Sequence, residues 1–310
     1  MKVLVTCPPM LGMIDDFRPI FADFGVEVTA PTVVQTLSVD ELKKIVPQHD
    51  GWIIGDDPAT RAVFAAGKAG RLKAAVKWGI GVDNVDFAAC ADLGIPIINT
   101  PNMFGGEVAD IAVGYVIALA RETFAIDRSV RQGQWPKPRG ISLSGKTVAL
   151  VGFGDIGKSA ARRLLAADMR IIAYDPVASN TRELAAVERA DWPLRLEEAH
   201  FIVITCALTP SSRRMVNEET LSRAKDGVRI VNVGRGPIID ETALEAALQS
   251  GKVHSAALDV FEVEPLPMNS YLRTNPHCVF GSHNASNTAD AVARTSEIAI
   301  GKLMDFLNSK

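Results

Sequence analysis

Cysteine is sparse in this 310-residue sequence and scattered along it. Its four cysteines, Cys7, Cys90, Cys206 and Cys278, form no CxxC pair and no cluster with metal-ligand spacing. Disulfide frameworks and structural zinc sites need paired or regularly spaced cysteines, so the sequence argues against both. We therefore expect no bound metal, and we expect free thiols in a reducing compartment, which predicts a cytoplasmic protein.

Strong net charge and long apolar runs are also missing. The formal net charge is −3, so the sequence lacks the basic field that attracts nucleic acid or an anionic membrane surface. The longest apolar stretch, residues 111–120, is interrupted by Gly114 and has about half the length that a membrane-spanning helix needs. The apolar run at residues 3–5 is too short for a signal peptide and predicts a buried strand. We expect neither a nucleic-acid nor a membrane partner.

The sequence does contain enough apolar material for two cores. Hydrophobic residues make up 47% and charged residues 22%, and the length is about twice that of a typical domain. Short β-rich runs alternate with helical patterns, as in parallel sheets connected by helices. The expected strands form two series, at residues 2–6, 26–29, 51–54, 75–78 and 95–98, then at 147–152, 170–174, 201–205, 229–233 and 256–258. The sequence therefore predicts an α/β fold with two doubly wound parallel-sheet domains.

Three helical patterns bear on the organisation of the chain. A helix over residues 38–46 should begin with a capping box, because Glu41 follows Ser38 by three positions. The pattern over residues 107–132 predicts one long helix that is apolar nearly all round and must be covered on most faces. The last pattern predicts a helix over residues 288–308.

A glycine motif, Gly152-Phe-Gly154-Asp-Ile-Gly157, lies between an apolar run and a helical pattern. Its three glycines suit a tight turn, close approach of the backbone to a pyrophosphate, and close packing of helix on strand. A lone motif of this kind is weak evidence, but here Asp175 ends the next expected strand. A carboxylate there would accept hydrogen bonds from the ribose hydroxyls and repel a 2′-phosphate, which favours NAD over NADP. The alternative is that Asp175 only opens an Asp-Pro turn.

A dinucleotide site directs attention to hydride transfer. Reduction of a 2-keto acid needs a cation for the carboxylate, an acid for the carbonyl oxygen, and a group that keeps this acid charged. Arg235 directly follows a strand and lies between glycines, which suits a carboxylate grip, although a surface arginine in a turn is the alternative. His283 follows the apolar run 278–280, and a capping or core histidine is its alternative. Asp259 and Glu264 follow the strand at 256–258, where ligands bind in open α/β sheets.

Together these motifs resemble those of the D-isomer-specific 2-hydroxyacid dehydrogenases over nearly the whole sequence, most closely the catalytic portion of D-3-phosphoglycerate dehydrogenases. The matching segments are residues 81–86, 99–101, 108–110, 152–157, 231–236, 258–261 with 264–265, and His283. The resemblance implies a Rossmann-type NAD domain, residues 101–283, inserted in a flavodoxin-like substrate domain, residues 1–100 plus 284–310. It also implies NAD as cofactor and a homodimer built on the NAD domain, with the helix near residues 107–132 at the interface.

The resemblance further implies a role for individual residues. Arg235 would bind the substrate's carboxylate and carbonyl, His283 would be the acid/base, and Glu264 would pair with His283 and raise its pKa. The backbone N–H groups of Ile80, Gly81 and Val82 would hold the substrate carboxylate, and Asp259 would hold the nicotinamide carboxamide. The expected cofactor contacts are Gly152, Gly154, Asp155, Ile156, Gly157, Asp175, Cys206, Val233, Gly234, Arg235, Asp259, His283 and Ser286.

One departure bears on the substrate, a small 2-hydroxy or 2-keto acid. Where phosphoglycerate enzymes tend to carry an arginine, this sequence has Gly55-Asp56-Asp57, and two carboxylates would repel a phosphate. Specificity is expected to lie in the loops at residues 8–13, 55–58 and 102–107. A rival hypothesis is an NAD-sensing binding protein of the same fold that is not an enzyme, like a corepressor. A third, weaker hypothesis is a dehydrogenase that acts on amino acids or on phosphonate.

Overall fold

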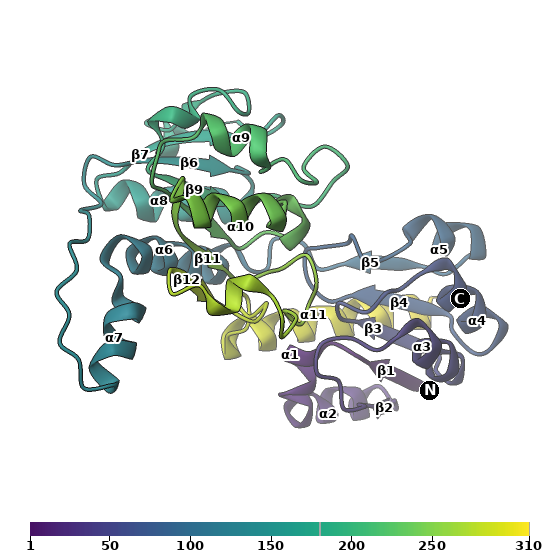
Figure 1. Cartoon of the computed structure of the whole chain (residues 1–310). Helices are drawn as coiled ribbons and strands as arrows, with labels where there is room; N and C mark the ends of the chain where they lie inside the picture. The colour runs from purple at the N-terminus through teal and green to yellow at the C-terminus, as the bar shows by residue number, and fades with distance from the viewer. Residues whose placement is uncertain (180, 310) are drawn as a thin grey trace. The chain divides into compact units, whose positions relative to one another are not determined.

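The computed structural model describes residues 1–179 and 181–309. The chain divides into two compact units, which are coloured along the sequence in Figure 1. Unit 1 comprises residues 1–103 and 287–310, and unit 2 comprises residues 104–286. The sequence places these two boundaries at 100/101 and 283/284, three residues earlier in each case.

Unit 1 is a five-stranded parallel sheet with helices. Its strands are β1 (Lys2–Val5), β2 (Glu27–Thr29), β3 (Gly51–Ile54), β4 (Ala74–Lys77) and β5 (Ile97–Asn99), in the order β2-β1-β3-β4-β5. Its helices are α1 (Pro8–Leu11), α2 (Ile14–Asp23), α3 (Val39–Ile45), the 3₁₀ turn η1 (Val46–Gln48), α4 (Arg61–Ala69), α5 (Phe87–Leu93) and α11 (Ala289–Asn308). This is the flavodoxin-like order, with a topological switch point between β1 and β3.

Burial explains why the central strands of unit 1 are mostly apolar. All residues of β3 and β4 are buried, as expected when helices cover both faces of a parallel sheet. The predicted capping box is present, because the Ser38 hydroxyl accepts a bond from the N–H of Glu41 and the Glu41 carboxylate accepts one from the N–H of Ser38. The helix α11 packs against β3 and β4, and the Trp78 indole donates to the Ser296 hydroxyl at 3.1 Å.

Unit 2 is a seven-stranded parallel sheet with the order β12-β11-β10-β9-β6-β7-β8. The strands are β6 (Thr147–Val151), β7 (Arg170–Tyr174), β8 (Glu188–Arg189), β9 (Phe201–Ile204), β10 (Val228–Asn232), β11 (Val253–Leu258) and β12 (Cys278–Phe280). The helices are α6 (Gly105–Arg121), α7 (Thr123–Arg131), α8 (Asp155–Ala166), α9 (Glu218–Arg223) and α10 (Glu241–Ser250), with 3₁₀ turns η2 (Arg182–Leu184), η3 (Leu196–Glu198), η4 (Gly236–Ile238) and η5 (Tyr271–Thr274). The order runs outward from β6 in both directions, as in a Rossmann sheet, so the predicted α/β fold with two doubly wound sheets is confirmed.

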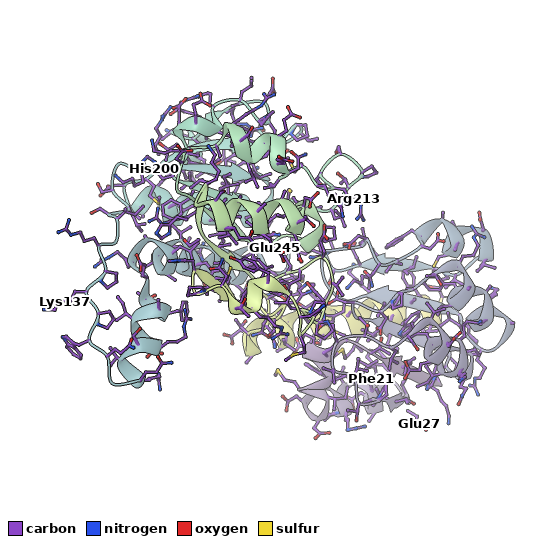
Figure 2. All side chains as sticks on the ribbon, viewed as in Figure 1. Phe21, Glu27, Lys137, His200, Arg213 and Glu245 are labelled. Carbon is purple, nitrogen blue, oxygen red and sulfur yellow. The ribbon has the colours of Figure 1, made fainter. Side chains whose placement is uncertain are left out.

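The prediction of one helix over residues 107–132 is wrong. Glu122 adopts a left-handed backbone conformation, with φ 54°, and this ends α6 before α7 begins. Residues 134–142 then form neither helix nor strand on the way to β6, and side chains in this segment, such as that of Lys137, are exposed (Figures 1 and 2). Among the helices of the described residues, none is both long and apolar enough to cross a membrane.

Candidate active site

The glycine motif forms the turn from β6 into α8. Gly152 has φ +94°, and a Cβ on it would lie 2.6 Å from the backbone N of Cys206. A Cβ on Gly157 would overlap the carbonyl oxygen of Gly152, so this glycine lets the helix pack on the strand. Gly154 is different, because a Cβ on it would meet no atom within 4 Å. The open space lies at the N-terminus of α8, where Asp155 and Ile156 begin the helix and backbone N–H groups attract a phosphate.

Asp175 braces this turn from the end of β7. Its carboxylate accepts bonds from the N–H of Phe153 at 2.8 Å, of Val177 at 2.9 Å and of Ala178 at 2.8 Å. Burial opposes ionisation, but the three N–H groups and nearby Arg189 outweigh it and lower the pKa of Asp175. The carboxylate thus stays charged beside the glycine turn. It forms the Asp-Pro turn of the alternative interpretation, and its predicted role toward a ribose stays a prediction.

Three further predicted cofactor contacts lie just after β9 and β10. Cys206 follows β9 and contacts Gly152, and burial raises the pKa of its thiol to about 11, so it is not a reactive thiolate. Val233 follows β10 and donates its N–H to the Ile204 carbonyl at 3.1 Å. A Cβ on Gly234 would lie 2.7 Å from the Cys206 carbonyl oxygen. The ends of β6, β9 and β10 therefore form one continuous edge.

Arg235 is held by its own loop. The side chain of Asn232 is fully buried, accepts a bond from the N–H of Gly234 at 3.0 Å and donates one to the carbonyl of Arg235 at 3.0 Å. Gly236 then packs directly on the backbone of Phe261, where a Cβ would overlap the carbonyl group. The half-buried guanidinium is thus carried by a rigid turn that touches the loop after β11.

His283 and Glu264 form a close pair. The Nδ1 atom of His283 lies 2.7 Å from Oε2 of Glu264, and the two side chains are 22% and 20% exposed. The other carboxylate oxygen of Glu264 accepts the N–H of Phe261 at 2.9 Å. His283 has φ +56°, a left-handed conformation that is uncommon for a residue with a side chain. A histidine held in this way is typical of a functional site.

Asp259 anchors the loop that carries His283. Its side chain is 2% exposed, and its carboxylate accepts bonds from the N–H groups of Asn284 at 3.2 Å and Ala285 at 2.9 Å. Its carbonyl accepts the N–H of His283 at 2.7 Å. Burial raises the pKa of Asp259, although the two N–H groups and His283 act in the opposite direction. A Cβ on Gly281 would overlap the Asp259 carboxylate, so only glycine fits there. The structure thus gives Asp259 a positioning role, and its predicted contact with the nicotinamide carboxamide stays a prediction.

Ile80, Gly81 and Val82 belong to unit 1, where they follow β4. Gly79 donates its N–H to the Thr100 hydroxyl at 2.7 Å, and Asn99 donates to the Ile80 carbonyl at 3.1 Å. These bonds hold the start of the loop, and exposure increases along it toward Val82. Ser286, another predicted contact, ends unit 2 and is half-buried.

The sequence of this chain is similar to a known family of proteins. The family model described as D-isomer specific 2-hydroxyacid dehydrogenase, NAD binding domain, matches residues 113–285, more than half of the 310 residues. The chain belongs to this family. It is therefore an NAD-dependent oxidoreductase of the 2-hydroxyacid dehydrogenase class, and NAD is its cofactor. The resemblance stated from the sequence is confirmed.

Individual members of the family match most of the chain. The hydroxypyruvate reductase of Thermotoga maritima is 39% identical over 288 residues, which are 91% of this chain and 91% of that protein. A chloroplastic D-3-phosphoglycerate dehydrogenase of Arabidopsis thaliana is 37% identical over 259 residues, 82% of this chain but 41% of that protein. The chain spans about half the length of the phosphoglycerate dehydrogenases that it matches. A solved structure from Thermus thermophilus has a TM-score of 0.88 at 29% identity and covers 99% of this chain and 97% of its own.

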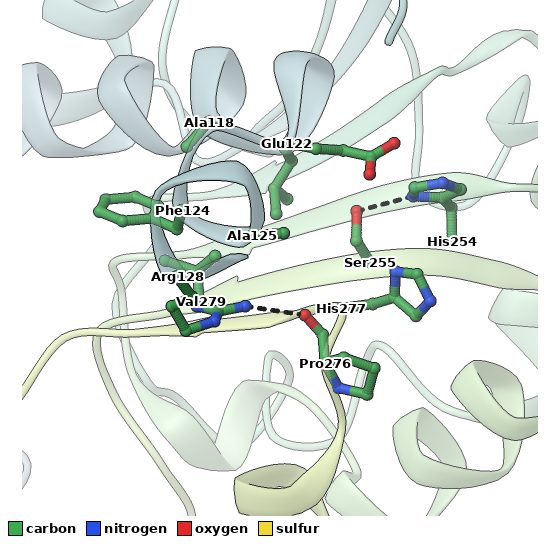
Figure 3. A pocket seen from close by; sticks show the side chains of 11 residues that line it. Ala118, Glu122, Phe124, Ala125, Arg128, His254, Ser255, Pro276, His277 and Val279 are labelled. Atoms are coloured by element: carbon green, nitrogen blue, oxygen red, sulfur yellow. Dashed lines mark hydrogen bonds between the residues drawn. The ribbon is translucent and has the colours of Figure 1, made fainter. Parts of the chain in front are cut away.

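In this 2-hydroxyacid dehydrogenase, a hollow lies at the amino ends of β11 and β12, whereas the predicted site residues follow the carboxyl ends of the strands (Figure 3). It is lined by α6, α7 and the residues at the starts of β11 and β12. Its two histidines are His254, whose Nδ1 lies 3.0 Å from the Ser255 hydroxyl, and His277. Burial, with Arg229 and His277, lowers the pKa of His254. None of the predicted site residues lines this hollow. Within residues 1–179 and 181–309, no group of three or more His, Cys, Asp or Glu side chains could hold a metal ion.

Two residues that the sequence did not single out hold predicted site residues in place. Asn232 braces Arg235, and Gly281 leaves room for Asp259. Asn232 lies inside the motif 231–236, where a buried amide could have been suspected from its place at the end of an apolar strand. Gly281 directly follows the apolar run 278–280 but belongs to no motif.

Proposed function

We propose that this chain interconverts a small D-2-hydroxy acid and the corresponding 2-keto acid, with His283 as the acid/base. The observation that carries this proposal is the 2.7 Å contact of His283 Nδ1 with Glu264, on the same sheet edge as Arg235 and the glycine turn. The strand order β12-β11-β10-β9-β6 brings these groups together, because the carboxyl ends of neighbouring parallel strands share one edge.

The pair suits proton transfer in both directions. Because Nδ1 contacts Glu264, we assign the exchange of a proton with the substrate oxygen to Nε2 of His283. In keto-acid reduction, a protonated His283 gives its Nε2 proton to the carbonyl oxygen, and in hydroxy-acid oxidation the neutral ring accepts the hydroxyl proton. The Glu264 carboxylate stabilises the charged ring.

Other groups of the chain bind and orient the acid. The guanidinium of Arg235 can hold the carboxylate and the carbonyl oxygen through parallel hydrogen bonds. We also propose that the backbone N–H groups of Ile80, Gly81 and Val82 bind the substrate. In this proposal residues 1–100 and 284–310 bind the substrate, whereas residues 101–283 bind NAD.

The residues present fit NAD. The open space at Gly154, the N-terminus of α8 and the charged Asp175 suit a pyrophosphate and a ribose without a 2′-phosphate. The contacts that we propose are Gly152, Gly154, Asp155, Ile156, Gly157, Asp175, Cys206, Val233, Gly234, Arg235, Asp259, His283 and Ser286. When bound, the reduced nicotinamide supplies the hydride that C2 of the keto acid receives.

The test is the rate of NADH oxidation with a panel of 2-keto acids: glyoxylate, hydroxypyruvate, pyruvate, phosphohydroxypyruvate and longer 2-keto acids. We expect steady turnover with small acids such as glyoxylate and hydroxypyruvate, in keeping with the name of the Thermotoga maritima relative. His283→Ala should abolish most of this turnover while NADH still binds. If the wild-type chain binds NADH but oxidises it with none of the acids, the NAD-sensing alternative takes its place.

We also propose a homodimer built on unit 2. Apolar side chains on α6, α7 and the segment after α7 are exposed: Ile117 by 43%, Phe124 by 46%, Val130 by 42% and Trp135 by 77%. Exposed apolar residues can mark protein–protein interfaces when they form one patch, and we propose that these do. Sedimentation should give twice the mass of the chain, and Phe124→Asp should shift it toward the monomer.

We propose a cytoplasmic location, supported by four free cysteines of which three are buried. Cell fractionation tests this location.

A further inference from the structure

The helix α10 (Figure 1) holds the loop that carries Glu264. Glu241, the first residue of this helix, accepts the N–H of Glu262 on its Oε1 atom at 2.6 Å. The preceding N–H of the loop, that of Phe261, is bonded to Glu264 itself at 2.9 Å. Two successive backbone N–H groups are therefore bonded to two different carboxylates, one from α10 and one from the pair with His283.

The turn that leads into α10 supports the same loop. Gly236 lies so close to Phe261 that a Cβ on this glycine would overlap the carbonyl group of Phe261. One short segment, residues 236–241, thus contacts the loop at two successive residues, Phe261 and Glu262. A loop held at two points leaves the Glu264 side chain little freedom, which preserves the geometry that proton transfer needs.

Glu241 is also one of several carboxylates that gather at this end of α10. Burial raises the pKa of Glu241, although the bond from the N–H of Glu262 acts in the opposite direction. Three neighbouring carboxylates raise it further, those of Glu262, Glu245 and Glu264. Asp240, the N-cap of α10, adds another carboxylate next to Glu241 in the sequence. Glu241 and Glu264 therefore interact through their charges as well as through the loop.

The other charged groups near the pair differ in sign. Asp259, whose buried carboxylate holds the loop of His283, also interacts with the charge of His283. Arg214 supplies a cation, because its guanidinium lies 3.4 Å from Oε1 of Glu262, but its side chain is 59% exposed and solvent screens its charge. Arg235 adds a second cation at the same sheet edge, on the turn that touches the loop. In these surroundings the negative charge of Glu241 adds to that of Glu264.

This charge bears on the direction of proton transfer. Negative charge near His283 favours the imidazolium form, and keto-acid reduction needs that form as its proton donor. We infer that Glu241 is a positioning residue for the pair of His283 and Glu264, which holds the loop of Glu264 and extends keto-acid reduction to higher pH. The inference rests on the proposed function, because it assigns proton transfer to His283.

Two substitutions separate the charge of Glu241 from its hydrogen bond. In Glu241→Gln the amide oxygen can still accept the N–H of Glu262, but the charge is gone. We expect the wild-type kcat at low pH, and a decline of reduction that begins about half a pH unit lower than in wild type. In Glu241→Ala the bond is lost as well, so kcat at low pH should also fall, by about threefold or more.

The experiment measures kcat for hydroxypyruvate reduction at saturating NADH over about pH 5–10 in wild type and in these variants. Glu218→Gln is the matched control, because Glu218 is likewise the first residue of a helix of unit 2, α9, but is exposed, so its pH profile should be that of wild type. The titration of His283, followed by NMR of its imidazole protons and assigned with His283→Ala, gives a second measurement that needs no substrate. Its midpoint should fall by about half a unit in Glu241→Gln.

If Glu241→Gln does not fold, Arg214→Gln tests the same effect with the opposite sign. It removes an exposed cation beside Glu262, so the decline of reduction and the midpoint of His283 should both move to higher pH.

The outcomes separate this inference from the proposed function. A wild-type midpoint of His283 in Glu241→Gln, an equal shift in Glu218→Gln, or no upward shift in Arg214→Gln would overturn the role of Glu241, whether or not the chain turns over a 2-keto acid. Failure of wild type and Glu218→Gln to reduce any 2-keto acid would instead overturn the proposed function, and the NMR titration would still test the effect of Glu241 on the pair.

Discussion

Gly281→Ala should damage the active site through a single added methyl group. Gly281 lies two residues before His283 and against the buried carboxylate of Asp259. A Cβ there would overlap Oδ1 of Asp259 and lie 2.6 Å from the Tyr115 hydroxyl, about 1 Å inside normal contact. Because Asp259 is 2% exposed and bonded to Asn284 and Ala285, it has little room to move.

The magnitude follows from two effects. Adding a methyl group to a well-packed site costs about 1–3 kcal/mol. If Asp259 shifts, at least one of its bonds from a backbone N–H is lost, and a hydrogen bond to a charged group contributes about 1.5–3 kcal/mol. We expect a loss of about 3 kcal/mol in the free energy of unfolding. For a unit of this size that is a fall of about 6–12 °C in Tm.

The assay combines thermal unfolding with steady-state kinetics. Because Asp259 also positions His283, kcat for keto-acid reduction should be at least about tenfold lower than in wild type when both are measured below the melting temperature. The Kd for NADH should change less. Gly301→Ala is the matched control, since a Cβ at this helical position meets no atom within 4 Å and should leave kcat unchanged. Wild-type Tm and wild-type kcat in Gly281→Ala would refute the idea that this glycine is required by the Asp259 anchor.

Further predictions concern the proposed chemistry. Glu264→Gln keeps the shape of the partner of His283 but removes the charge that stabilises imidazolium, so the pH above which reduction declines should be lower; unchanged pH–rate profiles would contradict the pairing. His283→Ala should lower kcat by about 10²–10⁴-fold, and a much smaller loss would remove it from proton transfer. Arg235→Ala should impair kcat and KM for the keto acid more than Arg235→Lys, with Kd for NADH little changed, and near-normal reduction would exclude Arg235 from substrate binding. Asp175→Ser should raise kcat/KM with NADPH relative to kcat/KM with NADH. If wild type already used the two cofactors equally well, Asp175 would not set the preference.

Most of the two sheets could be predicted because their central strands are buried on both faces. Such strands are continuous apolar runs, and β6, β7 and β9 were expected within one residue of their bounds. Strand β8 has only two residues, Glu188 and Arg189, and no apolar pattern, so nothing in the sequence marks it. The break at Glu122 was missed because a left-handed conformation usually requires glycine or asparagine, and this position has neither.

The site could be predicted as a set of residue types but not as a set of distances. Arg235 and Asp259 each follow an expected strand and His283 follows the apolar run 278–280, which favours a place at strand ends. That β10, β11 and β12 are neighbours, and that His283 meets Glu264 at 2.7 Å, follows from tertiary packing alone. The expectation of two equivalent repelling charges at Asp56 and Asp57 is wrong, because Asp57 is fully buried, whereas Asp56 keeps 35% of its side chain exposed. This could not be foreseen either, since adjacent residues in a loop have no fixed alternation of faces. The buried Lys77 ends a strand whose other members are apolar, and only the structure shows that the Asp56 carboxylate balances it at 3.2 Å.

The packing of α11 has a consequence for the order in which the chain acquires its structure during synthesis. This helix, made after all of unit 2, covers β3 and β4, which are made before it, and the Trp78 indole bonds to its Ser296. While the ribosome is still translating unit 2, that face of the unit 1 sheet lacks its covering helix. Unit 2, by contrast, is one uninterrupted stretch of sequence and can be complete before α11 emerges. Unit 1 is therefore begun before unit 2 but finished after it, and until then the apolar face that α11 will cover is open to aggregation.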